Sequence, residues 1–176
     1  WKRGAYKTRE QQRWYAGETV SVAVGQGYNA FTLMQLAQAT AVLANDGAYM
    51  KPQLLRSIRD ALSGEQTVVE PQTTHTIALK RENLEVIRRA LTDVTLSGTA
   101  SQAFVGAPYQ TAGKTGTAQW GPTDRQRIAA WFTGFMPAAE PRYAFTALYE
   151  GEPNDQSVHG GSHAAPLIGK AFREIY

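Results

Sequence analysis

The chain has 176 residues, of which 43% are hydrophobic, 19% are charged and none is cysteine. This composition excludes a collagen-like or disordered chain and, because cysteine is absent, a disulfide scaffold or a thiolate zinc site. The net charge is +3, and the first 13 residues alone carry +4. A solvated basic arm explains this cluster more plainly than a contact with phosphate or a membrane surface. No basic stripe with interleaved aromatic residues follows, so the sequence does not indicate nucleic-acid binding.

The first third of the chain predicts an extended segment followed by a helix. Residues 19–24 alternate small polar and apolar side chains, as a short strand does. Thr32 and Gln35 have the spacing of a capping box. The apolar face expected for the helix after them comprises Leu33, Leu36, Ala37, Thr40, Leu43 and Ala44. Asn45-Asp46-Gly47 predicts the end of this helix, with Gly47 in the left-handed conformation.

The middle third predicts a polar connection and a second helix. Residues 50–75 indicate short extended pieces, with a turn at Ser63-Gly64 and a strand stub at Val68-Val69. Between Lys80 and Thr95 the apolar side chains recur at helical spacing, and Arg88 and Arg89 are expected to face solvent. The apolar positions of this helix are Leu84, Ile87, Leu91 and Val94.

Three strands and a last helix are expected in the final third. The segments Tyr109–Gln119, Ala129–Met136 and Tyr143–Tyr149 are separated by turn-forming residues, so they predict an antiparallel meander. Ser162 is expected to cap the last helix. The aromatic residues expected in the core are Trp131, Phe132 and Phe135. The apolar stripe of the last helix comprises Ala164, Leu167, Ile168, Ala171, Phe172 and Ile175. The fold class is therefore α+β, with helices packed on an antiparallel sheet.

The segment Ala112–Ala118 contains Lys-Thr-Gly-Thr, which allows two interpretations. A phosphate-binding loop also ends in Gly-Lys-Thr, but it requires glycine where this sequence has Pro108, and it should open a helix. Because a strand-like segment surrounds the motif here, we reject the nucleotide interpretation.

The alternative is a strand that binds an acyl substrate. Thr115 and Thr117 are two residues apart and point to one side of a strand, so both hydroxyls could hold one carboxylate. Gly116 leaves the backbone accessible, whereas Lys114 faces the opposite side and needs its length or a strand twist to reach the same cleft. For so short a motif, an ordinary edge strand is the plain alternative.

Several other sequence segments are informative when they are taken together with this motif. They are Gly25–Tyr28, Leu43–Gly47, Pro52, Gly98–Ala100, Tyr109–Gln119 and Ala130–Pro137. Together and in this order they resemble the C-terminal part of the transpeptidase domain of class B penicillin-binding proteins. The resemblance is greatest to the penicillin-binding protein 2 group of Gram-negative cell-elongation D,D-transpeptidases, and it runs from about Trp14 to Tyr176. It implies a partial penicillin-binding-protein or serine β-lactamase-like fold that keeps the last three strands of a five-stranded antiparallel sheet.

The resemblance also implies an activity and roles for residues. In the family, a serine attacks the D-alanyl-D-alanine carbonyl of a peptidoglycan stem peptide, an amine of a neighbouring stem takes the acyl group, and β-lactams acylate the same serine. Lys114 would contact the Ser-x-Asn element, and Thr117 would supply a backbone N–H to the oxyanion. Thr115 and Thr117 would bind the substrate carboxylate. From their places on the strand, Gly116 and Trp120 are added to the candidate substrate-binding residues, with Trp120 at the mouth of the cleft. No cofactor or metal is implied.

The sequence departs from the family at the nucleophile. None of the seven serines has lysine three residues later, as Ser-x-x-Lys requires, or asparagine two residues later. Because the chain also starts with Trp1 rather than Met, we expect it to be a piece of a longer polypeptide and inactive alone. Residues 1–18 would then be a basic loop or arm at the cut end, and residues 19–176 the C-terminal part of the transpeptidase domain.

The expected partners follow from the same resemblance. They are stem peptides, β-lactams, the missing N-terminal half of the protein and, through the uncharged edge strand Tyr143–Tyr149, a second copy of the chain. The expected location is the periplasmic face of the inner membrane of a Gram-negative bacterium, with the anchor outside this chain. A non-catalytic cell-wall or partner-binding module and a related serine β-lactamase or sensor domain remain as alternatives.

Two further features of the sequence are a pair of histidines and a pair of aromatic residues. His159 and His163 are four residues apart, but the glycines between them favour a loop over a metal site, which needs three or four ligands. Trp14 and Tyr15 are expected to anchor the basic arm.

Overall fold

The structure is a computed structural model that describes residues 2–175 and divides into two compact units, residues 1–31 and 32–176. The predictions that include Trp1 and Tyr176 therefore extend beyond the described residues at both ends. Among the described helices, none combines the length and the apolar character needed to cross a membrane.

The first unit contains α1 (Lys2–Ala5), α2 (Arg9–Gln12) and α3 (Ala16–Ala23). The prediction of an extended segment over residues 19–24 was wrong, because these residues lie mostly in α3. The Glu18 carboxylate accepts a hydrogen bond from the Tyr15 backbone N–H (2.9 Å) and so caps the first turn. This local cap outweighs the β-like alternation that follows it.

The expectation of a solvated basic arm holds for Arg3, Lys7, Arg9 and Arg13, which are exposed, but not for Lys2, which is buried. Lys2 is only 8% exposed, and its ammonium donates to the Glu18 carboxylate (2.6 Å) and to the Arg13 carbonyl (2.5 Å). The ammonium also lies 5.3–5.7 Å from the ring centroids of Trp14, Tyr15 and Tyr28. A buried cation needs such partners, and they fix the arm against the aromatic residues.

The second unit begins with α4 (Leu33–Ala44), and the predicted capping box is confirmed. The Gln35 N–H donates to Thr32 Oγ1 (3.2 Å), and the Thr32 N–H donates to the Gln35 side chain (2.9 Å). Gly47 has the predicted left-handed conformation (φ 91°), and its N–H donates to the Val42 carbonyl (2.8 Å). The predicted apolar face is only partly buried, because Leu33 remains exposed.

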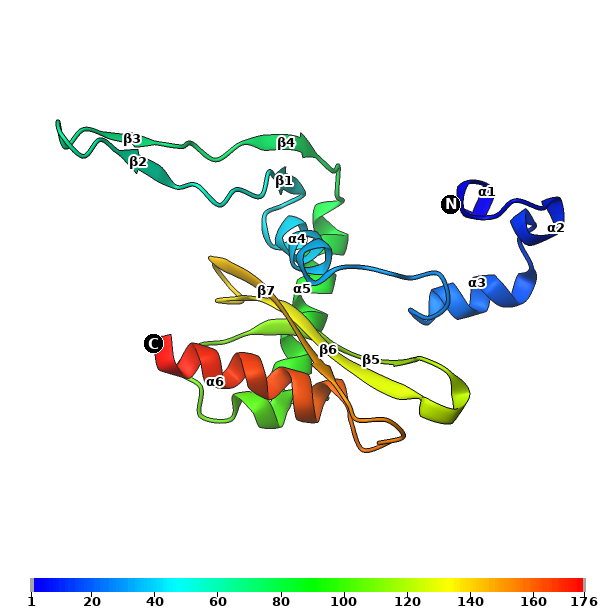
Figure 1. Cartoon of the computed structure of the whole chain (residues 1–176). Coiled ribbons are helices and arrows are strands. Elements are labelled where there is room, and N and C mark those ends of the chain that lie inside the picture. The colour runs from blue at the N-terminus through cyan, green and yellow to red at the C-terminus, as the bar shows by residue number, and fades with distance from the viewer. Residues whose placement is uncertain (1, 176) are drawn as a thin grey trace. The chain divides into compact units, whose positions relative to one another are not determined.

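One long ribbon with two separate strand pairings follows α4 and confirms the expected short extended pieces (Figure 1). Strand β1 (Ala48–Met50) pairs with β4 (Thr73–Thr76), and β2 (Ser57–Arg59) pairs with β3 (Gln66–Val68), both antiparallel. The predicted turn is present, with Gly64 at φ 74°. Backbone hydrogen bonds from Ser63 and Leu62, followed by the Ser63 hydroxyl, lower the pKa of Asp60.

Helix α5 (Arg81–Leu96) is confirmed, but Arg88 does not face solvent as expected. Its guanidinium donates to the Leu43 carbonyl (2.7 and 2.9 Å) and to the Ala44 carbonyl (2.8 Å), and it pairs with Asp46 (2.9 Å). The last carbonyls of a helix lack partners within the helix. Arg88 supplies these partners to the C-terminus of α4.

The predicted meander is confirmed as one antiparallel sheet in the order β5-β6-β7. Its strands are β5 (Ala112–Trp120), β6 (Arg127–Met136) and β7 (Tyr143–Glu150). Strand β5 starts three residues later than predicted, at Ala112. Among the described strands, β5 and β7 each have β6 as their only neighbour, so the sheet has two open edges.

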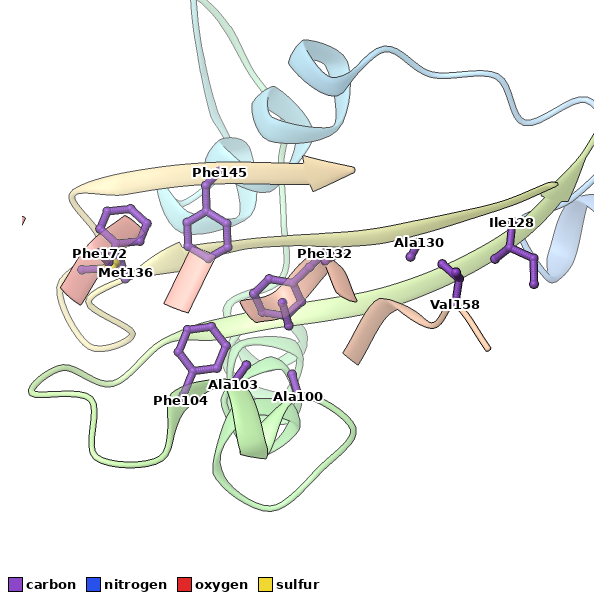
Figure 2. Close-up of a cluster of buried hydrophobic side chains, with 12 residues drawn as sticks. Ala100, Ala103, Phe104, Ile128, Ala130, Phe132, Met136, Phe145, Val158 and Phe172 are labelled. Carbon is purple, nitrogen blue, oxygen red and sulfur yellow. The ribbon is translucent and has the colours of Figure 1, made fainter. Parts of the chain in front are cut away.

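The core lies on one face of this sheet, under the 3₁₀ turn Ser101–Phe104 and α6 (Ala165–Ile175) (Figure 2). Phe132 is fully buried, and its ring centroid lies 5.6 Å from that of Phe104 and 5.7 Å from that of Phe145. The prediction that Phe132 and Phe135 are core residues is confirmed, whereas Trp131 is only partly buried.

Helix α4 covers the opposite face of the sheet. Thr40 and Thr133 share a hydrogen bond between their hydroxyls (2.7 Å), and the Thr133 and Thr146 hydroxyls are 2.8 Å apart. Because residues alternate between faces along a strand, Thr133 and its neighbour Phe132 lie on different sides. The sheet therefore has helices on both faces (Figure 1).

The entry into α6 differs from the prediction. A π-helical turn (Gly160–Ala164) precedes α6, so Ser162 lies inside the turn and is not the residue before the first turn. The predicted stripe is also too wide: Ala164 and Phe172 are buried, but Leu167, Ala171 and Ile175 are exposed. Gly169 occupies the buried face instead, where a side chain would collide with the Ala103 carbonyl.

Candidate active site

The Lys-Thr-Gly-Thr motif lies on the outer strand β5, with alternating faces as predicted. Thr115 pairs with Phe132 and Thr117 with Ala130, which places both threonines on the face of the buried core. Lys114 pairs with Thr133 and so belongs to the face of α4. Its side chain is exposed, and the ammonium turns back to donate to the Thr115 carbonyl (2.7 Å).

Both threonine hydroxyls have a hydrogen-bond partner beneath the strand. Thr115 Oγ1 lies 2.9 Å from Thr99 Oγ1, and Thr117 Oγ1 accepts a hydrogen bond from the Gly160 N–H (3.3 Å). The sequence predicted that the two hydroxyls share a side, but not these partners. The only sequence signal for Thr99 was its position in Gly98–Ala100, one of the segments that carry the resemblance.

The backbone of β5 presents alternate N–H groups to the open edge. A β-carbon on Gly160 would lie 2.6 Å from both the Gly116 and Trp131 carbonyl oxygens and 2.9 Å from the Gly116 nitrogen. Polar atoms of Gly116 and Trp131 thus lie close together, so Gly116 directs its N–H and C=O toward β6. In an antiparallel ladder the next residues on either side direct theirs away. The Thr115 and Thr117 backbone groups therefore face the open edge.

Two glycines of the π-helical turn allow that turn to pack closely against β5 and against Thr99. Gly160 packs directly onto the Gly116 and Trp131 backbones, and Gly161 packs onto the Thr99 carbonyl, where any β-carbon would collide. These contacts explain why His-Gly-Gly precedes the last helix. They also bring residues of the π-helical turn, the end of α5 and β5 to one place.

Trp120 lies at the end of β5, and the strand carries a single charged residue. Trp120 ends β5, pairs with Arg127 and is 45% exposed. It lies three residues beyond Thr117, about 10 Å along an extended strand. Lys114 is the only charged residue of β5, so the open edge carries one positive charge near the threonines.

The histidine pair lies nearby but forms no cluster of ligands. Across residues 2–175, no group of three or more histidine, aspartate or glutamate side chains could hold a metal ion. His163 Nδ1 lies 2.9 Å from the Ser162 hydroxyl, and the His163 ring centroid lies 5.0 Å from that of Tyr149.

Known proteins match the chain over nearly its whole length. The family described as "Penicillin binding protein transpeptidase domain" matches residues 2–175. Peptidoglycan D,D-transpeptidase MrdA of Haemophilus influenzae is 32% identical over 191 residues, which cover 98% of this chain and 27% of that protein.

Solved structures agree with this match. Pseudomonas aeruginosa PBP2, crystallised with WCK 5153, is 34% identical with a TM-score of 0.71, over 93% of this chain and 33% of that one. Penicillin-binding protein A of Mycobacterium tuberculosis, as a penicillin G acyl-enzyme complex, is 26% identical with a TM-score of 0.67, over 88% of this chain and 34% of that one.

The chain spans about a quarter to a third of the length of these relatives. The antiparallel sheet and the helices on both of its faces accord with the family match. The chain belongs to the penicillin-binding protein transpeptidase family and is of the penicillin-binding protein 2 type.

Proposed function

We propose that this chain forms the substrate-binding strand of a peptidoglycan D,D-transpeptidase that cross-links stem peptides and is acylated by β-lactams. The observation that carries the proposal is the geometry of β5. Two threonine hydroxyls share one side of an open-edge strand whose only charge is the Lys114 ammonium. That combination suits an elongated substrate that ends in a carboxylate and lies along the edge.

Each residue of the motif has a distinct role in this proposal. The Thr115 and Thr117 hydroxyls donate to the carboxylate of D-alanyl-D-alanine or of a β-lactam, and Lys114 adds positive potential. The Thr117 N–H, which faces the open edge, is one oxyanion donor, a kind of group worth about 3–4 kcal/mol of barrier. Gly116 keeps the approach to the strand free of a side chain, and Trp120 lines the mouth of the site.

The reaction also needs a nucleophile, which these 176 residues do not supply. Acylation joins a serine oxygen to the penultimate D-alanine carbonyl and releases the last D-alanine with a proton on its amine. The amine of a second stem then displaces the serine oxygen. None of the seven serines lies in Ser-x-x-Lys, so we propose that the chain alone is inactive and works with the segment that carries this motif.

Labelling with a fluorescent penicillin tests the proposal. We expect no covalent adduct on the chain alone. We expect stoichiometric labelling of a chimera in which the chain replaces the matching third of Pseudomonas aeruginosa PBP2. In that chimera Thr117→Val should slow acylation roughly ten- to a hundredfold, because a hydrogen bond to a charged group is lost. Thr74→Val, which removes a threonine hydroxyl on β4, serves as the control.

Either of two results would contradict the proposal. A stoichiometric adduct on the isolated chain would show that a nucleophile is present after all. A chimera that unfolds cooperatively on heating, and so is folded, but takes up no penicillin would show that β5 does not form the site.

The second open edge, that of β7, supports a further part of the proposal. Strand β7 pairs only with β6 among the described strands, and residues 143–149 are uncharged. We propose that another strand pairs with this edge: a strand of the segment that carries the nucleophile, or a second copy of the chain when it is alone. Because peptidoglycan lies outside the cytoplasm, the proposed location is the periplasmic face of a Gram-negative inner membrane.

A further inference from the structure

The Thr115 and Thr117 hydroxyls of β5 have hydrogen-bond partners of different kinds. Thr117 Oγ1 accepts a hydrogen bond from a backbone N–H, that of Gly160 (3.3 Å). Thr115 Oγ1 instead meets another hydroxyl, that of Thr99 (2.9 Å), and either oxygen could donate. The direction of this second hydrogen bond determines whether Thr115 has a proton available for a ligand.

The chemistry of a carboxylate decides that direction. An ionised carboxylate only accepts hydrogen bonds, so a threonine that binds it must donate its single hydroxyl proton. Thr115 then has no proton left for Thr99 and can only accept. With a carboxylate bound, the Thr99 hydroxyl is therefore the donor, as the Gly160 N–H is for Thr117.

The backbone of Thr99 is anchored well enough for this task. Its two neighbours bond to the last turns of α5: the Gly98 N–H donates to the Asp93 carbonyl (2.9 Å) and the Ala100 N–H to the Val94 carbonyl (3.1 Å). Ala100 is fully buried, and Gly161 packs against the Thr99 carbonyl. The hydroxyl of Thr99 thus projects from a fixed backbone toward β5.

We propose that Thr99 is a positioning residue that donates its hydroxyl proton to Thr115 Oγ1 and so directs the Thr115 proton to the substrate carboxylate. The inference rests on the carboxylate-binding role proposed for Thr115 and Thr117. Together, Thr99 and the Gly160 N–H form a pair of donors that orient the two threonine hydroxyls toward the same ligand group.

A titration of the 176-residue chain with N-acetyl-D-alanyl-D-alanine tests this inference. Binding is followed by the NMR shifts of the Thr115 and Thr117 amides, and the same dipeptide with a C-terminal amide serves as the uncharged probe. We expect Thr99→Val to weaken binding of the acid roughly three- to tenfold, the effect of one lost hydrogen bond, and to leave any response to the amide unchanged. Thr99→Ser, which keeps the hydroxyl, should restore the affinity for the acid.

Matched variants separate positioning from a structural effect. Thr74→Val removes a hydroxyl that bonds to the Tyr49 carbonyl (3.1 Å) on another sheet, and it should leave binding unchanged. In a Thr115→Val background, Thr99→Val should weaken binding no further, because its acceptor is gone.

The outcomes of this titration are distinct. Equal affinity of wild type and Thr99→Val for the acid would overturn the inference, as would weak binding by Thr99→Ser or an equal loss for acid and amide. A wild-type chain that responds identically to acid and amide would instead contradict the proposed function, because β5 would then not bind a carboxylate.

Discussion

At the scale of single residues, Gly160 determines how closely the last helix approaches β5. A β-carbon there would lie 2.6 Å from the Gly116 and Trp131 carbonyl oxygens, which are backbone atoms of two strands and cannot swing aside. We expect Gly160→Ala to lower the free energy of unfolding by about 1–3 kcal/mol, the usual cost of overpacking. Urea unfolding followed by circular dichroism measures it.

Gly17→Ala is the matched control for this substitution. Gly17 lies in α3, and no atom lies within 4 Å of the position its β-carbon would take. Alanine there should be neutral or should stabilise the helix by about 0.5–1 kcal/mol. Equal losses in the two variants would contradict the packing argument.

The pair Lys2 and Glu18 predicts acid sensitivity of the first unit. Hydrogen bonds from Lys2 and then from Tyr28 lower the pKa of Glu18 to about 2 from its ordinary 4.5. A carboxyl whose pKa is lowered by folding stabilises the folded state above its ordinary pKa, and this stabilisation is lost as the pH falls from about 4.5 to about 2. An NMR titration of the Glu18 carboxyl carbon measures this pKa directly.

The stability contributed by Lys2 depends on pH in the opposite direction to that contributed by Glu18. Burial lowers the pKa of Lys2, but the hydrogen bonds with Glu18 and Tyr28 outweigh it and raise that pKa above its ordinary 10.5. The contribution of Lys2 is therefore present below pH 10.5 and is lost as the pH rises through the higher value. Glu18→Gln should remove the acid-dependent change between pH 4.5 and 2; a change that persists would assign it to other groups.

At the scale of elements, the contact between α4 and α5 depends on one guanidinium. Arg88 on α5 bonds to the Leu43 and Ala44 carbonyls at the end of α4. Arg88→Met should lower the free energy of unfolding by about 1–3 kcal/mol, because partly buried carbonyls lose a charged donor. Thermal unfolding followed by circular dichroism measures the change.

The next residue provides the control for Arg88. Arg89 is exposed on the same helix and makes no ion pair among the described residues. Arg89→Met removes the same charge and should change stability by less than about 0.5 kcal/mol. Equal effects would show that net charge, not capping of α4, is responsible.

At the scale of the whole molecule, the open edge of β7 predicts self-association of the isolated chain. We expect sedimentation velocity to show a fraction of dimer that increases with protein concentration. The reason is that residues 143–149 are uncharged and have only β6 as a described neighbouring strand. Tyr149→Lys places a charge on this edge and should reduce the dimer.

A charge elsewhere on the surface tests whether the edge itself is responsible. Val105 is an exposed residue outside the sheet, and Val105→Lys adds the same charge. It should leave the dimer intact. A chain that remains monomeric at high concentration, or a dimer that both lysines reduce equally, would contradict pairing through β7.

Interactions within a few residues made much of the fold predictable. The Thr32–Gln35 capping box, the left-handed Gly47 and the shared side of Thr115 and Thr117 depend only on local spacing, and all three are present. The meander was predictable as well, because short turns oblige consecutive strands to pair. The family resemblance rested on the same ordered segments.

The remaining features depend on partners far away in the sequence. Arg88 meets a carbonyl 45 residues away, and Gly160 meets Thr117 at a separation of 43 residues. For the same reason neither the donor role of Thr99 nor the burial of Lys2 was evident from its neighbours. By itself the sequence determined periodicity, caps and turns, because these depend on the nearest few residues. Only the tertiary structure decided which polar groups meet, because burial obliges each of them to find a partner wherever the fold brings one close.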